Sequence, residues 1–308
     1  MKLTVNSKAF LLAITAILCW STMGTAFNLT LRFLETPVLL GTASVTALLI
    51  LLTIILFQKK ELFPSNKKSW LNSALMGFFN PFMYYLILFN AYKVLPAQEA
   101  MTLNYLWPVM LVIFMAIFTK TKIKPLSYLA LLVSFLGVAI IASRGNLLSM
   151  QFSNLKGDLL ALGSSLFWAG FFILNMKDKR EAVQKMFLNF FFATIYIIVY
   201  LIFTQNHIAL NFNGILGGIY IGTFEMAISF VLWLNALKLA SHPERISNLA
   251  FLSPFLSLLI IALVLKEKIL ISTFTGLIFI IAGILVQQYL PDKIKKNILG
   301  ENLKRETH

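Results

Sequence analysis

The sequence predicts an all-α integral membrane protein in which ten transmembrane helices form two inverted repeats of five helices. Composition is the first reason: the 308-residue chain is 59% hydrophobic and only 12% charged, and a soluble protein of this size could not bury so much apolar surface. The second is that several apolar runs reach the roughly 20 residues with which an α-helix crosses a hydrocarbon core about 30 Å thick. The third is that the second half of the chain repeats the pattern of the first.

The apolar runs follow one another with short polar connections, and together they leave no room for a separate soluble domain. The first run lacks the small-residue cleavage pattern of a signal peptide and further spans follow it, so we expect it to remain as a helix. The predicted spans are residues 9–29, 37–57, 70–92, 97–119, 125–143, 157–176, 186–204, 214–237, 246–265 and 269–290.

Positive charges are distributed unequally between the two ends of these spans. Of the 26 Lys and Arg residues, 20 fall on the side that both termini share. Because Lys and Arg accumulate in cytoplasmic loops, this predicts a multi-pass inner (plasma) membrane protein with both termini in the cytoplasm. The same bias explains the net charge of +14, which therefore does not indicate a nucleic-acid partner. The opposite side holds Arg32, Lys93, Arg144, Lys156, Lys266 and Lys268.

The internal repeat has a spacing of 145 to 148 residues. Because each repeat has an odd number of spans, the second begins on the face where the first ends, and the two are inverted. We expect a first repeat in residues 1–150, a second in residues 151–292 and a polar cytoplasmic tail in residues 293–308. Inverted repeats suit alternating access to one midplane site, and a purely structural duplication is the alternative. Corresponding pairs are Trp20 and Trp168, Glu99 and Glu244, Pro108 and Pro254, and Gly137 and Gly283.

Three tryptophans, Trp20, Trp107 and Trp168, fall close to the midpoints of predicted spans. An indole N–H at this depth needs a hydrogen-bond partner or a hydrated cavity. Helix packing explains any one of them equally well, but three at one depth predict a central aromatic-lined cavity for an organic substrate. Trp70 and Trp233 lie near span ends, as is typical of the interfacial belt.

The fourth and ninth spans each contain a proline. Pro108 removes a backbone donor and clashes with the carbonyl group of Asn104, and Pro254 does the same to Ala250. Broken backbone at membrane depth is tolerated where it lines a cavity, so two equivalent breaks predict a transport site. Kinks that only shape packing are the alternative. We expect these spans to offer Asn104, Tyr105, Asn248 and Ser253 to the substrate.

Glu225 is an acidic residue near the centre of the eighth span. A carboxylate there is costly, so it must face water, pair with a donor or stay protonated. Glu225 is therefore a candidate for proton coupling or for holding a substrate ammonium group, and a neutral Glu that only ties two helices together is an equal alternative. Its repeat equivalent is Asn80, so the halves differ chemically. Asn80 and Tyr84 of the third span complete the candidate substrate-binding set.

Other polar and small residues have simpler explanations. Glu99, Asp158 and Glu244 stand in the first turns of predicted helices, where we expect them to cap free backbone N–H groups. Small residues on the fifth and tenth spans permit close helix contact within a monomer or across a homodimer. These small residues are Ala130, Gly137, Gly276 and Gly283.

The sequence predicts neither a metal site nor a cofactor. Cys19 is the single cysteine, and His207, His242 and His308 are scattered. A membrane enzyme is disfavoured, because no Ser/His/Asp grouping and no phosphate-binding loop is present in the sequence.

Four motifs are spread over nearly the whole chain: Trp20-Ser21-Thr22, Asn104-Tyr105-Leu106-Trp107-Pro108, Leu252-Ser253-Pro254 and Lys266-Glu267-Lys268-Ile269. Together they resemble the drug/metabolite transporter (DMT) superfamily, EamA type. The resemblance implies ten helices, inverted repeats and transport of small metabolites, often export of amino acids. The stretches at 20–23 and 104–108 are similar to the bacterial aromatic amino acid exporters. Thr121 stands where the second repeat has the family's usual glutamate, Glu267.

We therefore expect a secondary transporter that exports amino acids or related small metabolites by alternating access. No nucleotide-binding motif is present, so energy would come from an ion or substrate gradient, with a proton at Glu225 as the candidate. A passive facilitator or channel-like uniporter is the alternative. The expected partners are a small-molecule substrate and the lipid bilayer, and the chain is expected to be a monomer or a homodimer.

Overall fold

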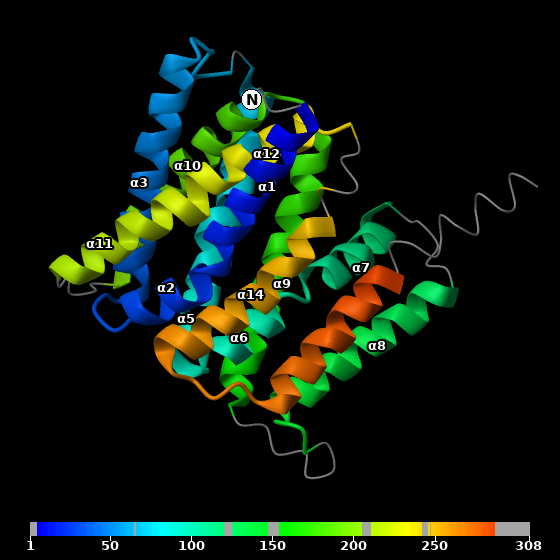
Figure 1. The fold of residues 1–308 in the computed structure, drawn as a ribbon. Coiled ribbons are helices and arrows are strands. Elements are labelled where there is room, and N and C mark those ends of the chain that lie inside the picture. The colour runs from blue at the N-terminus through cyan, green and yellow to red at the C-terminus, as the bar shows by residue number, and fades with distance from the viewer. Residues whose placement is uncertain are drawn as a thin grey trace, which may run out of the picture.

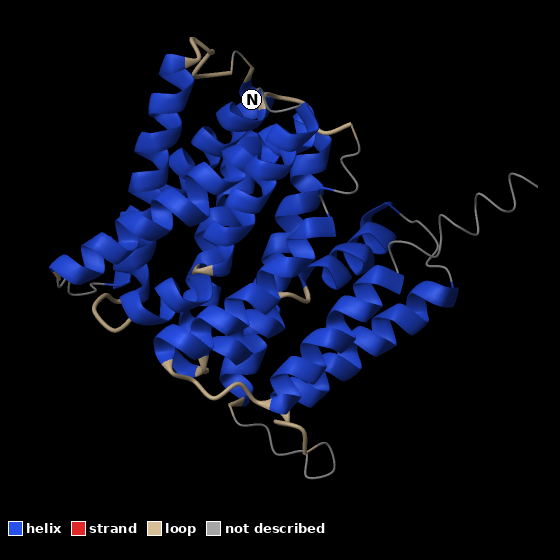
Figure 2. Ribbon diagram, viewed as in Figure 1, coloured by secondary structure: helices blue, strands red, loops and turns tan. Residues whose placement is uncertain are grey.

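In the computed structural model the described residues form helices joined by loops, and Figure 2 shows no strand among them. The structure describes residues 5–64, 66–119, 125–146, 154–204, 211–241, 246 and 248–286. The predictions for Thr121, Glu244, the three histidines and the tail lie outside these ranges. The all-α membrane fold is confirmed: six described helices are long and apolar enough to cross a membrane. They are Val5–Thr30, Thr36–Phe57, Lys67–Val94, Leu155–Met176, Ala182–Thr204 and Phe212–Leu239.

Three shorter apolar helices accompany these six in the described part of the chain: Tyr128–Ala142, Ala250–Leu265 and Ile271–Val286. The predicted span 97–119 is divided into two helices. The number of crossings and the inverted arrangement of the repeats therefore stay predictions.

The first half of the chain forms its long helices from apolar runs. Several of these helices are interrupted by a turn or by a π-helical segment. A turn at Thr22 separates the first two helices, and the Thr22 hydroxyl donates to the carbonyl oxygen of Cys19 at 2.7 Å. In bounds, the elements are α1 (Val5–Ser21), α2 (Met23–Thr30), α3 (Thr36–Phe57), α4 (Lys67–Gly77), the π-helical η1 (Phe78–Met83), α5 (Tyr84–Val94), α6 (Ala97–Asn104), α7 (Trp107–Thr119) and α8 (Pro125–Ala142).

The second half has the same kind of construction. Asn154 caps the first helix by accepting a hydrogen bond from the backbone N–H of Gly157, which satisfies one of its free donors. The elements are α9 (Leu155–Lys177), α10 (Ala182–Thr204), α11 (Phe212–Ile221), the π-helical η2 (Gly222–Ala227), α12 (Ile228–Leu239), the 3₁₀ turn η3 (Ala250–Leu252), α14 (Ser253–Ile260) and η4 (Ile261–Leu265). The helix Ile271–Val286 follows.

Interruptions of regular helix occur at comparable places in the two halves. The helix breaks at Tyr105 and Leu106, shortly before Pro108, and the 3₁₀ turn η3 immediately precedes the turn that contains Pro254. The π-helical segments η1 and η2 contain Asn80 and Glu225 respectively. Widened or broken turns of this kind are common at functional sites, because they free backbone groups and redirect side chains.

Helices of one half pack mainly against helices of the other. Helix α1 lies on α12 and α14, α9 lies on α5 and α7, and α10 lies on α3 and α4. Figure 1 shows α7, α8 and the orange-red helix Ile271–Val286 together at one side of the bundle. A Cβ atom on Gly137 would lie 2.5 Å from the carbonyl oxygen of Gly276. The small residues of this helix pair are therefore used for contact within the chain.

The connection between α9 and α10, on the predicted cytoplasmic side, is held by charged side chains. Arg180 pairs with Asp178 at 2.5 Å and also donates to the hydroxyl of Ser73 on α4 at 2.8 Å. Burial alone would raise the pKa of Asp178, but hydrogen bonds from Arg180 and the positive charge of Lys185 lower it overall. Lys60 pairs with Glu181 at 2.8 Å across the same end of the molecule.

Candidate functional site

Five aromatic side chains form a continuous series of ring contacts, which we call the aromatic chain: Trp20, Tyr84, Trp107, Trp168 and Phe230. The ring centroid of Trp168 lies 6.2 Å from that of Trp107, 4.9 Å from Tyr84 and 6.0 Å from Phe230. Phe230 lies 5.4 Å from Trp20. These separations are those of favourable aromatic pairs. The structure thus brings together the three tryptophans predicted at mid-span, and Tyr84 with them.

The aromatic chain draws on both halves of the molecule. Trp20, Tyr84 and Trp107 come from α1, α5 and α7, and Trp168 and Phe230 come from α9 and α12. The three tryptophans are partly exposed rather than fully buried. The Nε1 atom of Trp168 is buried and has no hydrogen-bond partner within the described residues. A buried N–H without a partner is costly, so a bound polar group would be favoured at this atom.

Polar side chains extend the site from Tyr84. Its hydroxyl donates to Asn104 Oδ1 at 3.1 Å, and Asn104 Nδ2 donates to Ser164 Oγ at 2.8 Å. Ser164 in turn donates to the carbonyl oxygen of Ala161 at 2.6 Å. This network fixes Asn104 at the C-terminal end of α6, next to the helix break.

The two interrupted helices meet where α6 contacts α14, and this places Tyr105 close to Ser253. Ser253 begins α14, and its carbonyl oxygen accepts from Ser21 Oγ at 3.3 Å. The break in the first half therefore contacts the turn at the start of α14 in the second half. Helix α1 contacts the same turn through Ser21.

Glu225 lies in η2 and accepts a hydrogen bond from the Tyr85 hydroxyl at 2.9 Å. The ring of Tyr85 lies 4.6 Å from that of Tyr84, so the carboxylate is joined to the aromatic chain through two neighbouring tyrosines. Glu225 is partly exposed. One donor on a carboxylate with two oxygens leaves acceptor capacity for a substrate ammonium group or for a proton.

Asn80 and Asn248 stand apart from this arrangement. The Oδ1 atoms of both are buried, and within the described residues neither has a hydrogen-bond partner. Asn80 has extended backbone geometry inside η1, with φ −149° and ψ 122°. Among the described contacts, no ring or hydrogen bond ties either amide to the aromatic chain.

Sequence reasoning missed three residues that the structure adds to the site. Tyr85 holds Glu225, Ser164 holds Asn104, and Phe230 links Trp20 to Trp168. Ser164 precedes Trp168 by one helical turn, and this spacing could have placed it on the same face. Trp233, predicted to lie in the interfacial belt, packs its ring 5.4 Å from that of Trp20.

A second group of polar residues lies at the end of the molecule where α6 begins, the predicted external end. Glu267 from the connection 266–270 accepts hydrogen bonds from the backbone N–H groups of Ala97 at 3.1 Å and Gln98 at 3.4 Å. The Gln98 side chain donates to the carbonyl oxygen of Lys268 at 3.0 Å and accepts from the N–H of Leu270 at 2.9 Å. A carboxylate of the second half thus caps a helix of the first half.

The same end contains Glu99, Arg144 and Asp158. Arg144 Nε donates to the fully buried Glu99 at 2.8 Å. The prediction that Asp158 caps its helix is wrong, because Asn154 occupies the N-cap and the Asp158 oxygens have no hydrogen-bond partner within the described residues. The Asp158 side chain is buried, and within the described part of the chain no hydrogen bond joins it to the N–H groups at the start of α9.

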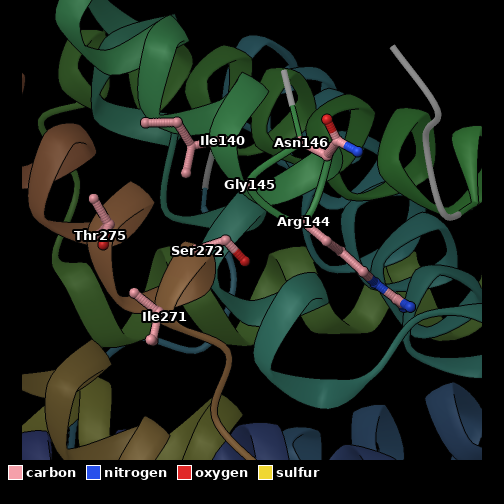
Figure 3. A pocket seen from close by; sticks show the side chains of 7 residues that line it. All are labelled: Ile140, Arg144, Gly145, Asn146, Ile271, Ser272 and Thr275. Carbon is pink, nitrogen blue, oxygen red and sulfur yellow. The ribbon is translucent and has the colours of Figure 1, made fainter. Parts of the chain in front are cut away.

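Cavities border the described helices in several places, and two of them are lined by residues relevant to the site. One, of about 470 Å³, lies between the end of α8 and the start of the helix Ile271–Val286 and is lined by Arg144, Asn146 and Ser272 among others (Figure 3). The other, of about 360 Å³, lies beside α2 and α11 and is lined by Thr22, Thr25 and Tyr220 among others. Within the described ranges, no grouping of His, Cys, Asp and Glu is suited to a metal ion.

Comparison with known proteins gives a consistent result. A solved crystal structure superposes with a TM-score of 0.64 at 21% identity, covering 94% of this chain and 99% of that one, which supports the same fold. An uncharacterized transporter of Archaeoglobus fulgidus is 24% identical over 91% of this chain and 97% of its own length. One of Clostridium kluyveri is 27% identical over 54% of this chain, and the match spans about half of that protein, 55%.

The EamA-like transporter family matches this chain twice, over residues 7–143 and residues 155–287. Together these matches cover almost all of the residues that the structure describes. The chain belongs to the EamA-like transporter family, and it is therefore a membrane transporter of the drug/metabolite type.

Proposed function

We propose that this protein is a secondary transporter that exports amino acids or related small metabolites through a site on the aromatic chain. One observation carries the proposal: rings and polar groups from helices of both halves meet beside the helix breaks and the π-helical segments. A site shared between two halves can be exposed to one side and then the other by a relative movement of those halves.

The proposed inversion of the repeats is supported by contacts that recur in both halves. A Cβ atom on Gly77 would lie 2.5 Å from the carbonyl oxygen of Asn189, and one on Gly222 would lie 2.4 Å from that of Ala43. Gly77 and Gly222 occupy corresponding places in the repeat. The close contact between Lys67–Val94 and Ala182–Thr204 therefore has a counterpart in the close contact between Phe212–Leu239 and Thr36–Phe57.

The chemistry of the site favours an amino acid with an apolar or planar side chain. Aromatic faces bind a planar group by stacking and attract an ammonium group by the cation–π interaction. Glu225 offers a carboxylate to the same ammonium group, and the unpartnered N–H of Trp168 offers a donor to a carboxylate. Ligand sites commonly combine a mainly apolar wall with a few such polar groups.

The contacts at the predicted external end support alternating access. Glu267 and Gln98 join the connection 266–270 to the start of α6. An outward-open state would have to break these hydrogen bonds, which tie one half to the other. We propose that they close the external end while the substrate site faces the cytoplasm.

Counterflow in proteoliposomes tests the proposed function. Vesicles are loaded with one unlabelled amino acid at a time, and uptake of labelled aromatic, branched, hydroxylated and cationic amino acids is followed. We expect transient accumulation of label for a restricted set that includes aromatic amino acids, because a carrier exchanges its substrates through one site. Equilibration of label without transient accumulation, by protein shown to be folded, would instead indicate a channel-like uniporter, and no uptake of any amino acid would indicate another substrate class.

A further inference from the structure

Asp158 is a buried carboxylate that the proposed transport site does not use. It lies in the first turn of α9, only 2% exposed, and within the described residues neither of its oxygens has a hydrogen-bond partner. An ionised carboxylate in such surroundings is strongly disfavoured, and removing the charge is the usual way in which the cost is avoided.

The charged groups that face Asp158 do not balance it. Glu99 of α6 and Arg144, which follows α8, are the groups that interact with it electrostatically. Arg144 is already paired with Glu99 at 2.8 Å. On the α5 side, Gly157 packs against Val94 and Leu95, and Lys93 is paired with Glu35. Among the described residues, Asp158 therefore lies near a second carboxylate and near one guanidinium group, which is already paired with Glu99.

Water has a route to this cluster through Arg144. The Arg144 side chain is 48% exposed and also lines the cavity of about 470 Å³. In Figure 3 it extends away from Ile140, Ile271 and Thr275, which line the other part of the cavity. One end of the cluster thus faces solvent, while both carboxylates lie in the protein interior.

We propose that Asp158 is a second proton-binding site, separate from Glu225, and that its proton stabilises the closed external end of the transporter. When this end is closed, Asp158 is buried beside Glu99 and is occupied by a proton. When it opens, water reaches Asp158, and the proton is exchanged with the external medium. The proposal rests on the proposed transport function for its role, but proton binding itself is measured without transport.

Infrared difference spectroscopy of the purified protein in lipid bilayers tests the proposal. Spectra are recorded from about pH 5 to about pH 9, a range that spans the pH at which buried carboxyl groups titrate. We expect the wild-type protein to show a protonated carboxyl C=O band near neutral pH that D158N lacks. The matched control E225Q removes a different carboxyl within a membrane span and should keep that band.

A second variant tests the cluster with Asp158 in place. In E99Q, Arg144 loses its partner and becomes available to Asp158, so the Asp158 carboxyl band should persist only to a lower pH than in the wild-type protein. A band that is the same in D158N and the wild-type protein would overturn the proposal. Loss of the band on addition of sodium chloride, but not of choline chloride, would also overturn the proposal, because the site would then hold a sodium ion.

These outcomes are distinguishable from failure of the transport proposal. Loss of the band in D158N supports the proton site whether or not counterflow is observed for any amino acid. Counterflow without a band assigned to Asp158 would leave the carrier function in place and overturn the proton site alone.

Discussion

At the residue scale, Glu225 places a carboxylate in a membrane span, where its charge is energetically unfavourable, and so provides a candidate site for a proton or an ammonium group. Its carboxylate is held by one tyrosine hydroxyl at 2.9 Å, and that tyrosine contacts the aromatic chain through Tyr84. A change in the charge of Glu225 would thus alter the electrostatic potential at the proposed substrate site. The residue was identified from the sequence because an acid near mid-span is rare.

We predict that Glu225→Gln abolishes acceleration of transport by a pH gradient, while substrate exchange persists at a lower rate because the carboxylate that would hold the ammonium group is lost. Glutamine keeps an oxygen acceptor for Tyr85 but cannot bind and release the proton. Uptake into proteoliposomes with and without a pH gradient measures the effect. Tyr85→Phe is the matched control, because it removes the donor and keeps the carboxylate, and it should retain gradient dependence. Unchanged gradient dependence in Glu225→Gln would remove the residue from this role.

Asp178 gives a pH prediction outside the membrane spans. Its pKa is lowered in the folded protein, chiefly because hydrogen bonds from Arg180 outweigh the effect of burial. A carboxyl group with a lowered folded-state pKa stabilises the fold above its unfolded pKa of about 4, and this contribution is lost as the pH falls through the folded value.

Asp178→Asn should therefore lower the free energy of unfolding at neutral pH by about 1.5 to 3 kcal/mol, the range for hydrogen bonds to charged groups. The difference from the wild-type protein should shrink below about pH 4. Thermal unfolding in detergent at several pH values measures it. Glu61→Gln, which changes an exposed acid nearby, should leave the unfolding temperature unchanged. A constant effect of Asp178→Asn at every pH would contradict the assignment.

Part of the residue-scale site was predictable and part was not. Trp20, Trp107 and Trp168 were found because their depth in the apolar runs is anomalous. Tyr85, Phe230 and Ser164 were missed, because their role depends on which face of each helix meets a neighbour from the other half. Asp158 was misassigned as a cap, since a first-turn position is also compatible with a buried side chain.

At the element scale, local breaks in helices shape the site. The break before Pro108 was expected from proline chemistry, and the structure places Tyr105 and Leu106 in a turn there. The interruptions at η1 and η2 were not expected; η1 contains a kink at Asn80 next to Pro81, and in η2 no single residue type specifies the extra residue of a π-helical turn. Gly77 immediately precedes η1 and Gly222 begins η2, and both glycines lie in close contact with a helix of the other half.

The capping of α6 by Glu267 gives a prediction for a whole element. In Glu267→Gln the backbone N–H groups of Ala97 and Gln98 lose a charged acceptor at the positive end of a helix, an interaction that contributes about 0.3 to 1 kcal/mol. We expect hydrogen–deuterium exchange at the start of α6 to be about 2- to 5-fold faster than in the wild-type protein.

Mass spectrometry of peptides covering α6 measures this exchange. Glu35→Gln is the control, because Glu35 is also paired at the predicted external end, with Lys93, but does not contact α6 in the described hydrogen bonds. Equal exchange at α6 in Glu267→Gln and the wild-type protein would show that the cap does not hold the external end closed.

At the scale of the whole molecule, composition and repeat were the strongest signals. Hydropathy alone predicted an all-α membrane protein, since spanning backbone must satisfy its own hydrogen bonds. The internal spacing predicted two related halves, and the EamA-like family matches the chain in two segments of similar length. The sequence predicted only a substrate class, amino acids or related metabolites, because the choice among them depends on the shape of a proposed site to which five helices contribute.

The central claim is that the aromatic chain between the halves binds the transported solute. Trp168 tests it, because its ring contacts Tyr84, Trp107 and Phe230. Trp70 is the matched control: its ring stacks on Phe63 at 5.5 Å and its Nε1 atom donates to the carbonyl oxygen of Pro64, outside the aromatic chain.

The most direct measurement is the initial rate of amino acid counterflow by Trp168→Ala and Trp70→Ala, in amounts of folded protein matched by thermal unfolding. Loss of a ring at the centre of a binding site lowers affinity by about 1 to 2 kcal/mol or more, so Trp168→Ala should lower the rate about tenfold at limiting substrate. Trp70→Ala should transport at nearly the wild-type rate. Equal rates in the two variants would place the substrate site elsewhere.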